Sequence, residues 1–140
     1  MADETQLAGA DGGQDAEERW APSPLSDGLI ERVVALLTGL GQPVRLRIVE
    51  VLSEGAVSTP NEIADRLGLT QQNVSKHLRT MAQAGLVART RSGSNALYSV
   101  KDRSVLDIVR LAAELAVHEI EDMASAAFRR EDNKVARDGE

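Results

Sequence analysis

The fold is decided by residues 67–79, which read LGLTQQNVSKHLR. In this segment and just beyond it, Val74, Leu78 and Met81 recur at helical spacing. They can therefore pack inward while the polar residues between them face solvent. Thr70 has the chemistry of an N-cap, and the spacing from this cap to the next glycine predicts a helix of about 14 residues. Its outward face would carry amides and cations: Gln72, Lys76, Arg79 and Gln83.

A shorter helix is predicted immediately before this one. The run Thr59-Pro60-Asn61-Glu62 matches a capping box with proline at the first helical position. Gly68 stands where the shorter helix should end, only two residues before the next cap. Two helices joined by a tight, glycine-containing turn are typical of a helix-turn-helix, whose second helix reads DNA.

Composition excludes several classes of protein. The chain has 140 residues, enough for one domain, and it contains no cysteine, so disulfides, thiolate metal sites and cysteine nucleophiles are absent. Neither histidine lies in a recognisable catalytic constellation and no glycine-rich phosphate loop follows a predicted strand, so we do not expect an enzyme. No apolar run is long enough to cross a membrane and no signal segment is evident, so we expect a cytoplasmic protein.

The net charge of −6 is unevenly distributed along the chain. Residues 1–26 hold six acids against one arginine, and residues 104–140 hold nine acids against five cations. By contrast, residues 41–103 hold nine cations against five acids. The positive charge is therefore concentrated around the predicted helix-turn-helix, where a phosphate backbone would meet it.

The rest of the sequence predicts a mainly α-helical domain with a small β-hairpin. Residues 1–26 should form a disordered acidic tail, residues 27–128 the folded domain, and residues 129–140 a flexible charged tail. The domain would open with a helix from Asp27, closed by Gly39 and Gly41, and continue with a central apolar helix over residues 43–54. Residues 86–90 and 96–100 read as two strands joined by a polar loop, which together form a wing.

The last predicted helix begins near Ser104 and carries an apolar stripe for more than six turns. One small core cannot cover such a stripe, so we expect a second copy of the chain to cover it. The homodimer interface would comprise residues of the first and last helices: Leu29, Val33, Leu37, Ile108, Ala112, Leu115, Ala116, Ile120 and Met123.

Three segments together resemble the ArsR/SmtB family of winged helix-turn-helix repressors. Gly41-Gln42-Pro43-Val44-Arg45-Leu46-Arg47-Ile48 is similar to the run that begins the family's central helix. Residues 73–78 and 84–87 resemble the family's recognition helix and the entry to its first wing strand. Residues 96–100 resemble the family's second wing strand. Over roughly residues 27–125, the resemblance implies a five-helix winged dimer that represses transcription by occupying an operator until a signal releases it.

The resemblance also bears on metal sensing. Many members bind metals through cysteines before the recognition helix, and this sequence has none there. Zinc sensors of the family instead use Asp-x-His near the start of the last helix, together with His-x-x-Glu near its end, which the partner copy supplies. His118 and Glu121 match the second pair, whereas Asp107 stands where the first histidine would be and Val105 where the aspartate would be. We therefore expect no cofactor, with weak binding of zinc or another divalent ion by Asp107, His118 and Glu121 as the alternative, or simply a polar edge of the helix.

We expect the DNA contacts to come from the recognition helix and the wing. The amides at the start of the helix suit base edges, and the cations and hydroxyls suit phosphates or guanine. His77 would donate to a phosphate or pack against the wing. The predicted set is Thr70, Gln71, Gln72, Asn73, Ser75, Lys76, His77, Arg79, Arg89 and Arg91. The alternative is a winged helix that binds proteins and reads no DNA.

Overall fold

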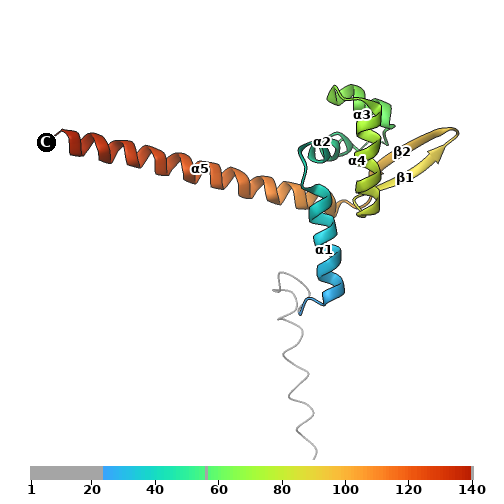
Figure 1. The fold of residues 1–140 in the computed structure, drawn as a ribbon, viewed down its shortest axis with the longest axis horizontal. Helices are drawn as coiled ribbons and strands as arrows, with labels where there is room; N and C mark the ends of the chain where they lie inside the picture. Colours follow the sequence, from blue (N-terminus) through green and yellow to red (C-terminus); the bar gives the residue numbers. More distant parts are fainter. Residues whose placement is uncertain (1–23, 56, 140) are drawn as a thin grey trace, which may run out of the picture. The chain divides into compact units, whose positions relative to one another are not determined.

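The computed structural model describes residues 24–55 and 57–139. The elements run in the order α1 (Asp27–Leu40), α2 (Pro43–Leu52), α3 (Pro60–Leu67), α4 (Gln71–Gln83), β1 (Val87–Ser92), β2 (Asn95–Val100) and α5 (Ser104–Asp138) (Figure 1). Most of the predicted N-terminal tail lies outside the described residues. The mainly helical fold with one hairpin agrees with the sequence prediction.

The centre of the core is α2, as its apolar sequence predicted. Ile48 is fully buried, and Val49, Val51 and Leu52 are almost so. They meet the inner stripe of α4, where Val74, Leu78 and Met81 are all wholly buried. Burial of each such side chain contributes roughly 1.5–3 kcal/mol relative to exposure, so this contact fixes which face of α4 looks outward.

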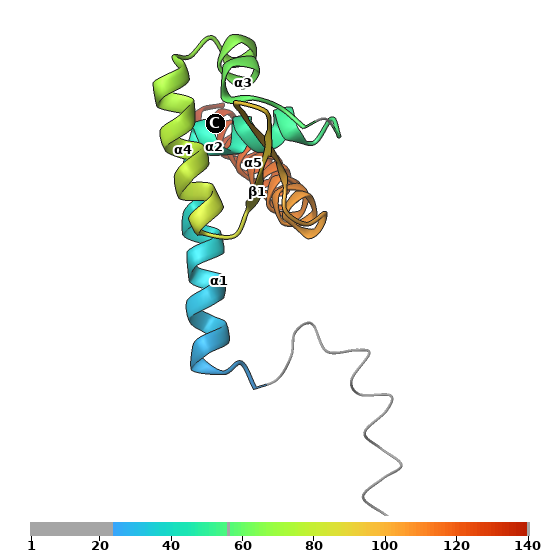
Figure 2. The same ribbon diagram turned by 90° about the vertical axis from the view of Figure 1, so that its right-hand side faces the viewer.

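The helix-turn-helix forms through the caps that the sequence predicted. The Thr59 hydroxyl accepts a hydrogen bond from the Glu62 amide at 3.2 Å, and the Thr70 hydroxyl accepts one from the Asn73 amide at 3.2 Å. Between the helices Gly68 has φ +67°, a left-handed conformation that favours glycine. Figure 2 shows α3 beside the N-terminal end of α4.

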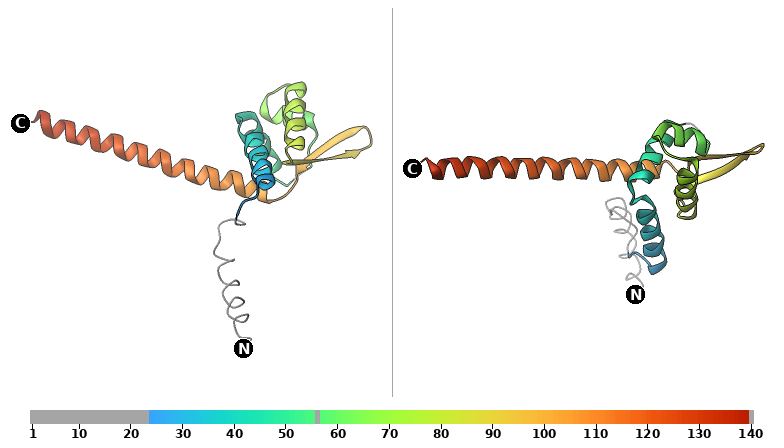
Figure 3. Two further views of the ribbon diagram at one scale, coloured as in Figure 1. Left: turned by 60° about the horizontal axis from the view of Figure 1, so that its bottom comes forward. Right: turned by 45° about the horizontal axis from the view of Figure 1, so that its top comes forward.

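The wing is an antiparallel pair in which Val87 faces Val100 and Ser92 faces Asn95. The strands therefore extend further than predicted, and only Gly93 and Ser94 form the turn. Gly93 supplies a positive φ of 62°, which two-residue hairpin turns favour. The base of the hairpin is anchored by Ser58 and Tyr98, which exchange two backbone hydrogen bonds of 3.0 and 2.8 Å. The hairpin projects past the helices of the core (Figure 3).

Two glycines were expected to close the first helix. Helix α1 ends at Leu40, directly before Gly41, so Gly39 lies inside the helix. Gly39 is there because of packing. A Cβ built on it would lie 2.8 Å from Leu86 Cδ1 and 2.9 Å from Ala84 Cβ, so only a residue without a side chain fits.

The last helix continues into residues 129–138, part of the segment that the sequence predicted as a flexible charged tail. Helix α5 continues to Asp138, because no glycine or proline interrupts residues 104–138 and the charged residues there are good helix formers. At its start, the Asp102 carboxylate accepts hydrogen bonds from the Ser104 amide (2.8 Å) and hydroxyl (2.7 Å). This capping lowers the pKa of Asp102 below its ordinary value. In the described part of the chain, no helix is long and apolar enough to cross a bilayer.

Replacing Gly39 with alanine should lower the free energy of unfolding by about 1–3 kcal/mol, because the added methyl overpacks the contact with Leu86 and Ala84. This loss should outweigh alanine's advantage in helices of about 1 kcal/mol. Urea unfolding followed by circular dichroism at one protein concentration measures it. Gly28→Ala on the same helix is the control, since nothing lies within 4 Å of its Cβ position and it should not destabilise. Equal stability of the two variants would contradict the packing role of Gly39.

Candidate nucleic-acid interface

The outer face of α4 presents the polar side chains that the sequence placed there. Gln71, Gln72 and Asn73 are exposed at its N-terminal end, and Lys76 and Arg79 are exposed further along. Ser75 is half-buried. Thr70 is exposed as well, but its hydroxyl oxygen already caps the helix. Three exposed amides in a row at the start of a helix can present donors and acceptors together, which is the chemistry that base edges require.

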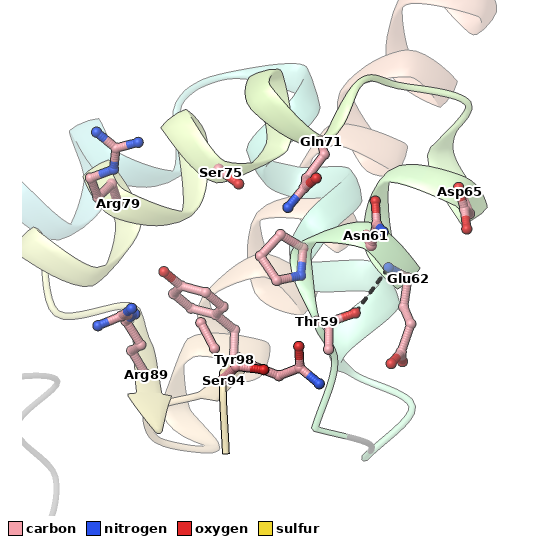
Figure 4. A pocket seen from close by; sticks show the side chains of 13 residues that line it. Thr59, Asn61, Glu62, Asp65, Gln71, Ser75, Arg79, Arg89, Ser94 and Tyr98 are labelled. Atoms are coloured by element: carbon pink, nitrogen blue, oxygen red, sulfur yellow. Dashed lines mark hydrogen bonds between the residues drawn. The ribbon is translucent and has the colours of Figure 1, made fainter. Parts of the chain in front are cut away.

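A cleft of about 680 Å³ lies between α3, α4 and the wing (Figure 4). Arg79 of α4 and Arg89 of β1 line one end of the cleft, and Glu62 and Asp65 of α3 line the opposite end. The Tyr98 side chain lies between them and points into the cleft. The cleft therefore has a cationic side toward the wing and an acidic side toward α3, so an anion would be attracted to the wing side.

The cations of this face differ from Arg47 and Arg66 in their partners. Arg47 pairs with Glu50 at 3.0 Å, and Arg66 pairs with Glu54 at 2.6 Å. The Arg66 guanidinium lowers the pKa of Glu54, first through hydrogen bonding and then through its charge. Among the described residues, no carboxylate lies within 4.0 Å of the charged groups of Lys76, Arg79, Arg89 or Arg91. As far as the described residues go, these four cations can meet an external anion.

His77 has a partner that the sequence did not reveal. Its Nδ1 accepts a hydrogen bond of 3.3 Å from Arg45 Nε on α2. Burial lowers the pKa of His77, and the nearby charges of Arg45 and Lys76 lower it further. Both effects favour the neutral imidazole, whose Nδ1 accepts from α2. Of the ten residues predicted for DNA contact, His77 is the one that the structure ties most closely to the core.

Several residues of the cleft were missed by the sequence reasoning. Tyr98 and Asn95 of β2 line it, and so do Ser94 of the hairpin turn and Asn61 of α3. Tyr98 was seen only as part of a strand pattern, because its position beneath Arg79 depends on how the wing packs against α4. Conversely, Arg91 and Lys76 do not line the cleft, although they are exposed and belong to the same elements as Arg89 and Arg79.

The candidate metal ligands are separated along α5. Asp107 and His118 are 11 positions apart, which is roughly 16 Å along a helix. The Asp107 carboxylate lies 3.6 Å from Arg110, which also pairs with Glu114 at 3.0 Å. In residues 24–55 and 57–139 of one copy, no three His, Asp or Glu side chains come together to hold a metal ion. His118 and Glu121 could share an ion only with groups from elsewhere.

The apolar residues predicted for the dimer interface are mostly exposed in one copy. On α1, Leu29, Val33 and Leu37 are 36%, 39% and 54% exposed. On α5, Leu115, Ile120 and Met123 are 69%, 65% and 67% exposed, and Ala112 and Ala116 are exposed too. Ile108 differs because it packs partly against its own core.

Known proteins resemble this chain in sequence and in fold. A family model described as a helix-turn-helix domain matches residues 40–90. The HTH-type transcriptional repressor SmtB of Mycobacterium tuberculosis is 36% identical over 100 residues, which cover 69% of this chain and 73% of that protein. The HTH-type transcriptional regulator NmtR of the same organism is 33% identical over 98 residues, covering 69% and 81% respectively.

A solved structure extends the comparison to the fold. It is the homodimeric winged helix-turn-helix DNA-binding domain of a possible ArsR-family transcriptional regulator from Mycobacterium bovis. The two align with a TM-score of 0.62 at 24% identity, over 71% of this chain and 94% of that one. The solved structure has the same winged helix-turn-helix fold as this chain. Because the chain is 36% identical to SmtB and 33% identical to NmtR, it belongs to the ArsR/SmtB family of winged helix-turn-helix regulators.

Proposed function

We propose that this chain is a transcriptional repressor that binds double-stranded DNA as a homodimer. The observation that carries the proposal is a set of four cations, gathered around a helix that exposes three adjacent amides. Within residues 24–55 and 57–139, none of the four pairs with a carboxylate. Relatives that share more than a third of their aligned residues with this chain include a named transcriptional repressor. Repression would follow from occupying an operator.

The recognition helix α4 would enter the major groove with its N-terminal end toward the bases. Gln71, Gln72 and Asn73 would then meet base edges, where amide side chains pair well with adenine N6 and N7. Lys76 and Arg79 stand one to two turns further along the helix, at the distance where the flanking phosphates would pass. Ser75 and Thr70 would support these contacts, Thr70 by keeping the helix end capped.

The wing would hold the backbone of the same duplex. Arg89 and Arg79 face one cleft, and the Tyr98 side chain points into it between them and the acids of α3. A phosphate seated at the cationic side would be kept from the acidic side by repulsion from Glu62 and Asp65. Arg91 lies nearer the hairpin tip and would reach a more distant phosphate or the minor groove.

Dimerisation would cover the exposed apolar side chains of α1 and α5. Side chains such as Leu115 and Met123 are more than half exposed in one copy, an arrangement that soluble proteins resolve by burying the patch in an interface. A related fold from Mycobacterium bovis is homodimeric. Two recognition helices held about 34 Å apart would then meet one face of the duplex, and the operator would be an imperfect palindrome.

Removing the Arg79 side chain should weaken operator binding and reduce its dependence on salt, because one phosphate contact per subunit is lost. The slope of log affinity against log salt should fall by about one per contact removed. Fluorescence anisotropy over a series of salt concentrations measures both quantities. The control is Arg47→Ala, which removes the same charge from a residue that is paired with Glu50 and does not line the cleft. Weak wild-type binding with little salt dependence would instead favour a protein-interaction module.

Replacing Gln72 with alanine should relax sequence preference, at a cost of roughly 1–3 kcal/mol at the base it reads if its contact is bidentate. Selection of bound sequences from a random DNA pool, followed by affinity measurements on single-base variants, would show which position loses its preference. Gln83→Ala removes another exposed amide, at the far end of α4, and should leave the preference unchanged. An unaltered preference in Gln72→Ala would place the reading face elsewhere.

A glutamate at position 115 should dissociate the dimer, because a charge would be buried in the interface without a partner. Sedimentation equilibrium at several concentrations measures the change. Val135→Glu introduces the same charge at a 72%-exposed position on the same helix, outside the predicted interface, and should leave the dimer intact. A Leu115→Glu protein that stayed dimeric would show that α5 does not form the interface in this way.

A further inference from the structure

The last turn of α1 packs against the residues that follow the C-terminal end of the recognition helix α4. Gly39 is buried, and its Cα side approaches Ala84 and Leu86 so closely that an added Cβ would lie within 3.0 Å of both. These two residues follow α4 directly and lead into β1. Gly85, between them, lies with its own Cβ position 3.9 Å from Leu36 Cδ2. The end of α1 therefore packs against the point where the recognition helix ends and the wing begins.

A second connection joins the same turn to the middle of α4 through one arginine. Arg45 Nη1 donates to the carbonyl oxygens of Thr38 (3.4 Å) and Gly39 (3.3 Å), while its Nε donates to His77 Nδ1 (3.3 Å). The last carbonyls of a helix have no partners within the helix and carry partial negative charge, so a guanidinium is well suited to bind them. The side chain is half-buried, and its rigid fork can serve both helices at once.

The hydrogen bond between Arg45 and His77 determines which nitrogen of the imidazole carries the proton. Arginine can only donate, so His77 Nδ1 must be free of a proton, and the ring must be neutral with its proton on Nε2. Burial and the charges of Arg45 and Lys76 lower the pKa of His77, which agrees with this state. His77 lies within α4 between two exposed residues of the outward face, Lys76 and Arg79. A displacement of the His77 ring would therefore move the neighbouring side chains that are proposed to meet DNA.

We propose that Arg45 is a positioning residue that couples the end of α1 to the recognition helix through His77. Leu37, beside the carbonyls that Arg45 binds, is 54% exposed and belongs to the surface proposed to pair with a second copy. Covering that surface in the dimer would fix the last turn of α1, and the Arg45 fork would carry this constraint to α4. The inference rests on the proposed function, because it assigns Arg45 a part in operator binding without a contact to DNA.

The first test uses Arg45→Met, which keeps the bulk of the side chain and removes its donors. We expect operator affinity to fall roughly tenfold with the salt slope unchanged, because no phosphate contact is lost while α4 is less well placed. The matched control is Arg47→Met, two residues away on the same helix, whose partner Glu50 is exposed. A reduced salt slope would show that Arg45 itself binds phosphate and would overturn the proposal. So would affinities equal to those of the control. Thermal unfolding and sedimentation on both variants establish that the comparison is between folded dimers.

The second test asks whether the effect passes through His77. Asparagine at position 77 places an acceptor near the site of Nδ1, so His77→Asn should stay within about twofold of the wild-type affinity, whereas His77→Leu should fall with Arg45→Met. The double variant Arg45→Met/His77→Leu should bind no worse than either single variant. Additive losses would mean that the two residues act independently and would reject the coupling.

A third measurement does not require DNA. In ¹⁵N spectra of the imidazole, the wild-type protein should show a proton-free Nδ1 and a protonated Nε2, and Arg45→Met should raise the pKa of His77 because a nearby positive charge is removed. A protonated Nδ1, or a pKa that does not respond, would overturn the contact. Wild-type protein that bound no duplex would reject the proposed function, and the imidazole spectrum would still decide whether the contact exists.

Discussion

Three wholly buried side chains on the inner stripe of α4, Val74, Leu78 and Met81, determine what the rest of the molecule can present. They lock the helix against the equally buried Ile48 of α2, and a rotation of α4 would expose them to water at a cost of roughly 1.5–3 kcal/mol each. Because the rotation of α4 is fixed, the amides at the start of the helix and the cations along it face solvent. The polar surface is thus a consequence of apolar packing beneath it.

Electrostatic pairing separates arginines with a structural role from those free to act on a partner. Arg66 forms a forked pair with Glu54, and Arg47 pairs along its helix with Glu50. Such exposed pairs contribute little stability, but they satisfy the charge of both partners locally. The cations on α4 and the wing have no such partners among the described residues. A chain with net charge −6 can therefore present a positive surface, because its acids are mostly placed elsewhere.

Much of the fold could be predicted from local sequence, because its signals are local. Thr59 and Thr70 cap their helices as expected, Gly68 takes the left-handed turn, and the wing lies where two strand-like runs joined by a polar loop predicted it. The errors arose where distant residues decide. Gly39 looked like a helix stop because its contact with Ala84 and Leu86 is invisible in the sequence. Residues 129–138 looked like a tail because charge was weighed above helix propensity.

The candidate site divides in the same way. The amides and cations of α4 could be assigned from helical periodicity, which needs no knowledge of neighbours. The cleft could not, because Tyr98, Ser94 and Asn61 come from two elements that meet only after the wing packs against the helices. In the sequence, Arg45 is only one member of the run that begins the central helix. Its hydrogen bond to His77, 32 positions away, is visible only in the tertiary structure.

The Tyr98 side chain belongs both to the core and to the cleft. Only 5% of the residue is exposed, yet its side chain reaches into the cleft, so its ring is anchored in the core while its hydroxyl lies near Arg79 and Arg89. It is also the only tyrosine in the chain. The phenol is therefore a built-in spectroscopic probe that needs no label. Its ring resonances would report whether the packing of the hairpin changes when a ligand occupies the cleft.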